Sequence, residues 1–332
     1  MIPVQITQLS TNKNPIHLTL DVGWVEKYKT VTGNPIVISD GVKDTLLKKL
    51  QMTLEPKQSG SGTPSPSNIR PISGWTGAVV TRDGKNLLPP KFYRGVGYNS
   101  AVGTQFTLTD ITNTVTESSG VFSKSVSAWG GITMVSDELP NGAYHLYTVL
   151  TSHGLRMTGY VLDKDLKVVR QFELLGSGTT MTLNENITLA DTECYIAVMC
   201  ASNVAGTVSF SYPQIEVGSA KTDYEPYQGH TYTTDLPQTV YGGTLDVVSG
   251  VLTVTHGYIS QYNGETINEP WISDRDEYVA GTTPTTGAQV VYLLATPTTI
   301  QCDPQTVSLL AGENVIMGDG DMEITYRVKA SA

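Results

Sequence analysis

The feature that most constrains the fold is an alternation of apolar and polar residues that recurs along most of the chain. A period of two sends successive side chains to opposite faces of a strand, so such segments suit sheets with one buried face. Two stretches, 245–257 and 315–328, have this pattern on both sides of a turn, at Ser249-Gly250 and at 318–321. Single strands are predicted at Ile16–Val22, Gln51–Pro56, Thr76–Arg82 and Gly206–Val217. The pattern predicts an all-β fold.

Helical signals are confined to two short segments. Residues 41–50 have room for a turn or two. The second segment, Asp303–Leu310, combines an N-cap aspartate, a proline at the first helical position and a terminating glycine at Gly312. We therefore expect one or two short helices beside the strands.

The charge of the chain argues against two classes of partner. The formal net charge is −10, and the densest basic stretch, Lys43–Lys49, is interrupted by Asp44 and two leucines. Phosphate would repel such a chain, so we expect it to bind no nucleic acid and no anionic membrane surface. It contains no run of 18 apolar residues, and its first residues lack a signal-peptide pattern, so neither membrane insertion nor signal-directed secretion is expected.

The sequence contains no recognisable catalytic or metal-binding motif. Its five histidines form no HExxH pair, no GxSxG elbow occurs, and the paired acids lie mostly in turns. We expect no catalytic residues, no cofactor and no enzymatic activity. Asp319 and Asp321, within Gly-Asp-Gly-Asp, are weak candidates for calcium ligands, because the same residues also suit a hairpin tip. The three cysteines, Cys194, Cys200 and Cys302, are expected to be small buried side chains.

Aromatic residues give the main indication of binding. The chain has 17 tyrosines and 5 phenylalanines, and tyrosine combines a ring that can be buried with a polar tip. Sugars stack on such rings, so a flat carbohydrate-binding platform is one hypothesis; core packing of the same rings is the other. Trp129 is the first candidate, because its two following glycines suggest a loop. The other candidate rings are Tyr93, Tyr98, Tyr144, Tyr147 and Tyr160.

Two stretches divide the chain. Residues 58–71 are rich in Gly, Ser and Pro, which predicts an exposed loop. Tyr224–Gly229 follows the last strand of one stretch of the chain and precedes a stretch of different character. Between Lys91 and Gly218 lie about eight strand-like segments, which is the length and strand count of a jelly-roll sandwich. A chain of 332 residues also favours two domains.

Three segments resemble sequences found in virion and tail-associated proteins of phages and prophages from Gram-positive gut bacteria. They are Glu55–Gly77, Val240–Ser260 and Gln289–Val328. The portion between the first two resembles a carbohydrate-binding-module-like jelly roll of phage tail proteins. The resemblance implies a discontinuous β-domain, formed by residues 1–90 and 229–332, with a jelly roll inserted at 91–228. It supplies no catalytic residues.

The resemblance implies a virion structural protein displayed on the particle surface, of the tail, baseplate or fibre type, with a glycan-adhesion role for the jelly roll as a hypothesis. A capsid decoration or head-fibre protein is one alternative, a bacterial surface adhesin another, and a polysaccharide-degrading enzyme a remote one. The expected partners are other virion proteins, further copies of the chain in a homo-oligomer (a trimer is favoured), and host or mucosal glycans. The expected location is the virion, assembled in the bacterial cytoplasm and then extracellular.

Overall fold

The computed structural model describes residues 27–39, 45–63, 65, 67–96, 100–175, 178–267, 270–274 and 283–328. The strand expected at Ile16–Val22 lies outside these residues. Within them the chain is nearly all β, as the alternation predicted, and its one helical element is a short 3-10 turn, η1 (Thr112–Thr114). No described helix has the length and apolar character needed to cross a membrane.

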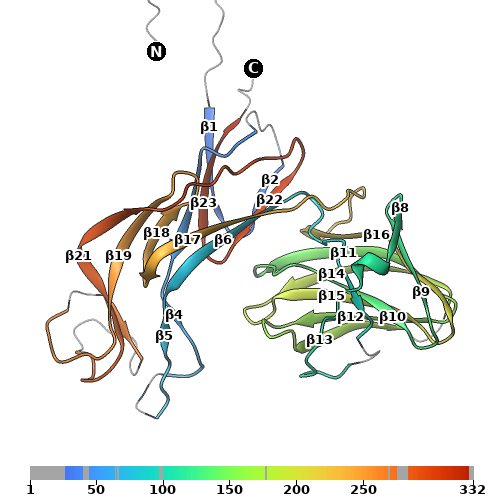
Figure 1. Cartoon of the computed structure of the whole chain (residues 1–332), viewed down its shortest axis with the longest axis horizontal. Coiled ribbons are helices and arrows are strands. Elements are labelled where there is room, and N and C mark those ends of the chain that lie inside the picture. The colour runs from blue at the N-terminus through green and yellow to red at the C-terminus, as the bar shows by residue number, and fades with distance from the viewer. Residues whose placement is uncertain are drawn as a thin grey trace, which may run out of the picture.

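The strands form two units that lie side by side (Figure 1). One, here called the base unit, contains a seven-stranded sheet in the order β1-β23-β3-β18-β19-β21-β20, a four-stranded sheet in the order β17-β6-β22-β2, and the ribbon β4-β5. Its early strands are β1 (Lys27–Gly33), β2 (Ile36–Ile38), β3 (Lys49–Leu54), β4 (Lys57–Gln58), β5 (Ile72–Ser73) and β6 (Trp75–Asp83). Its later strands are β17 (His230–Val240), β18 (Gly243–Asp246), β19 (Val251–Ile259), β20 (Trp271–Ser273), β21 (Val290–Gln301), β22 (Asn314–Gly318) and β23 (Met322–Val328).

Alternating burial within the base unit follows the sequence pattern. In β3, Leu50, Met52 and Leu54 are fully buried, while the residues between them are partly exposed. Side chains from β2, β6, β18 and β23 pack against these β3 residues in one apolar cluster. This cluster lies between the two main sheets of the base unit. Early and late parts of the chain are interleaved, because β3 pairs with β18 and β23, and β6 pairs with β17 and β22.

The second unit is a jelly roll built from strands β7 to β16. Its β12 sheet has the order β13-β12-β15-β10-β7, and its β11 sheet has the order β14-β11-β16-β9-β8. Apart from the hairpins β8–β9 and β12–β13, successive strands alternate between the two sheets, as in a jelly roll. The bounds are β7 (Phe92–Arg94), β8 (Thr116–Ser118), β9 (Val121–Val126), β10 (Gly131–Val135), β11 (Gly142–Thr151), β12 (Leu155–Leu162), β13 (Val168–Leu175), β14 (Thr180–Leu189), β15 (Tyr195–Ser202) and β16 (Gly206–Val217).

The core of the jelly roll lies between its two sheets, and the base unit contributes to it. Val315 and Met317 of β22 belong to the same buried cluster as the inward-facing residues of the jelly roll. The outer face of the β12 sheet carries a further apolar cluster that includes Phe106, which precedes the first jelly-roll hairpin. The segment after β16, residues 218–229, is here called the exit segment and returns the chain to β17. Val315 and Met317 thus connect the jelly-roll core to the base unit, and Phe106 covers part of the outer face of the β12 sheet.

Two sequence-based predictions in the base unit are wrong. Asp303–Leu310 forms no helix, because its backbone N–H groups bond to distant segments: Gln305 donates to Val247 O, and Leu309 to Thr45 O. The stretch 315–328 is no hairpin either. Its two strands, β22 and β23, belong to different sheets, so 318–321 forms a corner between sheets. By contrast, Ser249-Gly250 does join a pair of adjacent strands, β18 and β19.

Candidate functional site

Trp129 lies on the loop between β9 and β10, and its side chain is 71% exposed. Its backbone has a φ of 63°, in the left-handed region that non-glycine residues seldom adopt. Hydrogen bonds hold the loop in this form: Trp129 N donates to Ser202 O at 2.7 Å, and Gly130 N donates to Ser127 O at 2.9 Å. A large ring is therefore fixed outside the fold by backbone that is itself strained, a combination that clusters at functional sites.

The surroundings of Trp129 come from neighbouring loops at the same end of the jelly roll. The Arg156 guanidinium lies 5.9 Å from the centre of the indole ring, within range of a cation–π contact. The β11–β12 and β15–β16 loops meet beside it, where Asn203 N donates to Gly154 O at 2.9 Å. The loops at the opposite end, including Asp137 and Lys164, face the base unit. The Trp129 end is thus the end directed away from the base unit.

The other predicted aromatic residues do not join Trp129 in one platform. Tyr144 and Tyr160 are fully buried, so the prediction that they form an exposed surface is wrong. Tyr144 belongs to the core between the sheets and its hydroxyl donates to Pro140 O at 2.7 Å. Tyr93 is half-buried on β7, against the cluster on the outside of the β12 sheet. Tyr98 lies outside the described residues.

Tyr147 is the predicted ring on the outer face of the β11 sheet, where it is half-buried. Lys221 from the exit segment places its Nζ 4.4 Å from the centre of the ring. Asn184 of β14 is the register partner of Tyr147 on one side, and Gln214 of β16 on the other. The next outward residue on β11, His145, contacts the side chains of Asn184 and Asn186 at 2.9 and 2.7 Å. This face is polar, and the exit segment crosses it.

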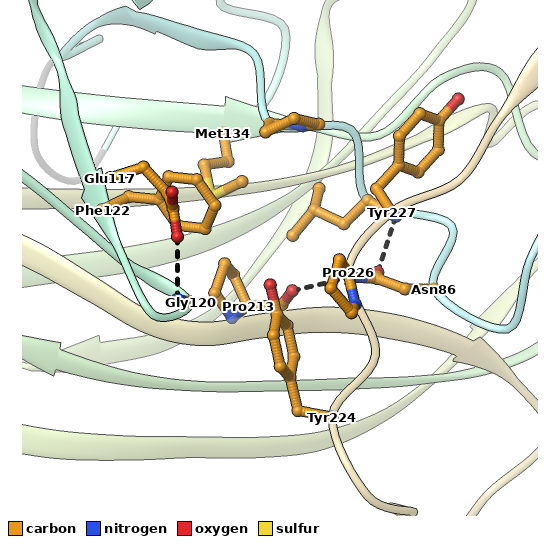
Figure 2. A pocket seen from close by; sticks show the side chains of 11 residues that line it. Asn86, Glu117, Gly120, Phe122, Met134, Pro213, Tyr224, Pro226 and Tyr227 are labelled. Carbon is orange, nitrogen blue, oxygen red and sulfur yellow. Dashed lines mark hydrogen bonds between the residues drawn. The ribbon is translucent and has the colours of Figure 1, made fainter.

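A pocket of about 370 Å³ opens where the chain enters and leaves the jelly roll (Figure 2). Five segments line it: the entry segment before β7, the β8–β9 hairpin, β10, β16 and the exit segment. Sequence reasoning noted Tyr224–Gly229 as a boundary and missed its role as a wall. Most of the lining is proline, aromatic or aliphatic: Leu88, Pro90, Phe122, Met134, Pro213, Tyr224, Pro226 and Tyr227, beside Asn86, Glu117 and Gly120.

Asn86 fixes the two chain segments that cross at this pocket. Its side chain is 2% exposed and makes four hydrogen bonds. Nδ2 donates to Pro213 O at 3.1 Å and to Glu225 O at 3.0 Å, while Oδ1 accepts from the backbone N–H groups of Leu88 at 3.0 Å and Ile215 at 3.2 Å. One amide therefore ties the entry segment to β16 and to the exit segment, and leaves none of its own donors unused.

A cleft of about 720 Å³ separates the near end of the jelly roll from the base unit and is lined by acidic residues. Asp319 and Asp321, the weak calcium candidates, lie on its base-unit side, and Asp137 and Asp191 lie on the jelly-roll side. Among the described residues, no three His, Cys, Asp or Glu side chains are grouped closely enough to hold a metal ion. The three cysteines are free, and two of them, Cys200 and Cys302, are buried.

No family model matches the chain, and neither does any curated protein. Among solved structures, the enzymatically active domain of bacteriophage CBA120 tailspike protein 4 aligns with 43% of this chain at 10% identity and a TM-score of 0.23; the alignment spans 19% of that chain. Structures of infectious bursal disease virus strains Gx and Gt align with 92% of this chain and 79% and 80% of theirs, at 10% identity and TM-scores of 0.17 and 0.20. At these TM-scores the similarities assign neither a family nor a function.

Proposed function

We propose that this chain is a non-enzymatic structural protein of a phage particle, and that its jelly roll adheres to glycans through Trp129. Three sequence segments that resemble phage virion proteins support the first part. The single observation that supports the second is the exposed, strained and hydrogen-bonded Trp129 on the outward end of the jelly roll. The loops at one end of the jelly roll point away from the base unit. This arrangement suits a tail, baseplate or fibre position, and it suits capsid decoration equally well.

The chemistry of the outward end suits a neutral sugar. Indole offers a rigid apolar face that loses little conformational entropy on binding, and a sugar ring stacks on such a face. A chain with a net charge of −10 repels anionic polymers, whereas neutral sugars meet no such penalty. One site of this kind is expected to bind weakly, with a Kd of about 0.1–1 mM. Many copies on a particle would raise the avidity by about 10²–10⁴.

Trp129→Ala should abolish adhesion of the assembled protein to glycans. Because the ring is exposed, the melting temperature should change by less than about 2 °C. The measurement is binding of multivalent protein to a glycan array, with melting followed by circular dichroism. Tyr28→Ala is the matched control, since Tyr28 is an exposed aromatic residue of the base unit, and it should leave adhesion intact.

A glycan array without hits for the parent protein would contradict the adhesion role. A large loss of melting temperature in Trp129→Ala would instead make Trp129 a structural residue. Labelled antibodies in micrographs of phage particles test the virion assignment separately, and protein found on neither heads nor tails would refute it.

A further inference from the structure

Tyr224 lines the pocket of Figure 2, and its ring is held against that of Tyr212, which is not itself part of the lining. Tyr212 and Tyr224 contact each other edge to face, with ring centres 5.4 Å apart, and Tyr212 is 44% exposed. The tip of the β8–β9 hairpin lies directly against both rings. A Cβ atom on Gly120 would lie 2.9 Å from the Tyr224 ring and 3.0 Å from the Tyr212 ring, so only glycine allows this approach.

Backbone strain supports the view that this arrangement is maintained. Among the described residues, four that are not glycine have a positive φ, and two of them, Ser119 and Tyr212, directly precede the lining residues Gly120 and Pro213. Ser119 belongs to a two-residue hairpin turn, which requires such angles. Tyr212, at a φ of 55°, lies where the register of β16 against β11 shifts, and its N–H donates to Gly120 O at 2.8 Å. The bulge thus turns Tyr212 toward the hairpin and Tyr224.

The interior of the pocket is apolar. Phe122, Met134 and Leu88 are buried members of the jelly-roll core that also line the pocket, and three prolines, Pro90, Pro213 and Pro226, complete its walls. Proline has no backbone N–H, so these walls offer few donors to a ligand. A volume of about 370 Å³ falls at the small end of the range of roughly 300–1,000 Å³ for ligand pockets.

The pocket lining carries one negative charge and no cation; its other polar side chains are Asn86, whose donors are already used, and the tyrosines Tyr224 and Tyr227. Glu117 is the charged residue in its lining; one oxygen of its exposed carboxylate accepts Gly120 N–H at 2.9 Å. The pKa of Tyr224 is raised from its ordinary value by burial and then by the negative charge of Glu117, which lines the same pocket. A ligand that enters here therefore needs hydroxyl or amide donors and no negative charge.

We propose that this pocket binds an N-acetylated neutral sugar. Its ring would stack on Tyr224, which Tyr212 supports from behind, its hydroxyls would donate to Glu117, and the methyl of the acetyl group would occupy the apolar interior beside Met134 and Phe122. This inference extends the proposed glycan adhesion. It rests on the proposed function in one respect, because it takes the jelly roll to be a glycan-binding domain. The site is separate from Trp129, because the pocket is at the junction with the base unit and Trp129 is at the outward end.

The test uses ligand-observed saturation-transfer NMR on the full chain, with methyl N-acetyl-β-glucosaminide and methyl β-glucoside as probes. We expect the N-acetylated probe to bind at least fivefold more tightly, with the strongest saturation on its acetyl methyl. Glu117→Gln should weaken its binding about tenfold, because a neutral amide oxygen is a weaker acceptor than a carboxylate. Glu265→Gln is the matched control, since Glu265 is exposed on the base unit and, like Glu117, accepts one hydrogen bond.

Equal binding of the two probes, absence of saturation transfer, or unchanged binding in Glu117→Gln would each overturn the proposal. Tyr224→Phe gives a second measurement, because it keeps the aromatic ring in the pocket wall and removes its hydroxyl; we expect a two- to fivefold loss of affinity. Trp129→Ala separates this proposal from the proposed function. Binding of the N-acetylated probe should survive that substitution, and loss of all binding would place the sugar site at Trp129 and not in the pocket.

Discussion

Asp83, the last residue of β6, is a buried carboxyl at the point where the base unit meets the jelly roll. It is 1% exposed, and its Oδ1 has no hydrogen-bond partner among the residues that the structure describes. Burial raises its pKa from the ordinary 3.8 to about 7; the charge of Asp137 adds to this increase, while the Tyr227 hydroxyl and Arg82 oppose it. Tyr227 also donates to Asp137 Oδ2 at 3.3 Å, so two carboxyls compete for one hydroxyl.

The raised pKa of Asp83 predicts how the free energy of unfolding depends on pH. Between about pH 4 and pH 7, native Asp83 holds a proton that the unfolded chain has lost. The free energy of unfolding should therefore fall as the pH rises through this window, by on the order of 4 kcal/mol, and level off above about pH 7. Glu313, whose pKa is also raised, mainly by burial, adds a smaller fall of the same sign.

Asp83→Asn should remove most of this pH dependence, because an amide needs no proton to remain neutral. Urea unfolding at pH 5, 6, 7 and 8 measures it, and the variant should exceed the parent in stability at pH 8. Asp165→Asn is the control, since Asp165 is exposed in the β12–β13 turn. An equally steep fall in Asp83→Asn and in the parent would contradict the prediction.

Residues differ in how far the sequence reveals their position. Tyr144 and Tyr147 are three positions apart in one strand, so parity alone places them on opposite faces, and the structure does so. A platform that contained both was therefore excluded by the sequence itself. The two glycines after Trp129 did indicate a loop, and the ring is exposed. The Tyr212–Tyr224 contact depends on a bulge and a distant hairpin tip, which no local pattern contains.

At the scale of elements, the turn between β18 and β19 gives a sharp prediction. Gly250 has a φ of 73°, and a Cβ atom there would lie 2.2 Å from the backbone oxygen of Cys302. Gly250→Ala should therefore lower the free energy of unfolding by about 2–4 kcal/mol, from left-handed strain and displacement of this neighbouring chain. Gly312→Ala is the control, because it has open space and no positive φ, and should stay within about 0.5 kcal/mol.

Thermal or urea unfolding of the two glycine variants compares them directly. Equal stability of both would show that the turn relaxes without cost and would contradict this account. The backbone bonds at the turn make relaxation difficult, because Gly250 N donates to Asp246 O and Cys302 N donates to Gly250 O, both at 2.8 Å.

Elements with strong alternation were predictable, and those decided by tertiary pairing were not. The strand expected at Gly206–Val217 is β16 with the same bounds, and its first half shows the alternation, with Val208 and Phe210 buried between more exposed residues. Asp303–Leu310 has helix caps, yet its N–H groups pair with other segments of the base unit. The caps are local preferences of about 1 kcal/mol, which long-range pairing in a buried core outweighs. The same holds for 314–328, whose strands pair in two different sheets.

At the scale of the molecule, we propose that the jelly roll is a domain inserted between β6 and β17. These two strands pair with each other, with Arg82 opposite His230, and Gly84 N donates to Gln228 O at 2.9 Å. The chain thus leaves and re-enters the base unit at adjacent points, the condition under which an insertion disturbs its host least. Asn86 then joins the two crossing segments on the jelly-roll side.

We also propose that the domain boundary lies before residue 91. Leu87 and Leu88 are buried members of the jelly-roll core, at 1% and 2% exposure, and Asn86 bonds to β16. A fragment 85–228 should therefore unfold cooperatively, whereas 91–228 lacks these two leucines and should be less stable by about 3–6 kcal/mol, from roughly 1.5–3 kcal/mol for each buried side chain. Thermal melting of both fragments measures this difference.

The base unit supplies the complementary experiment. With residues 85–228 replaced by two glycines, β6 and β17 need only a tight turn to remain paired, since Arg82 and His230 already face each other. Because Val315 and Met317 lose the jelly-roll core as their cover, the shortened base unit should fold but be less stable than the parent. Replacing both by threonine should recover its solubility, and the β-branched side chain of threonine suits a strand. If both the fragment 85–228 and this base unit aggregate or lack a cooperative transition, the two units fold only together, and the jelly roll is no independent insertion.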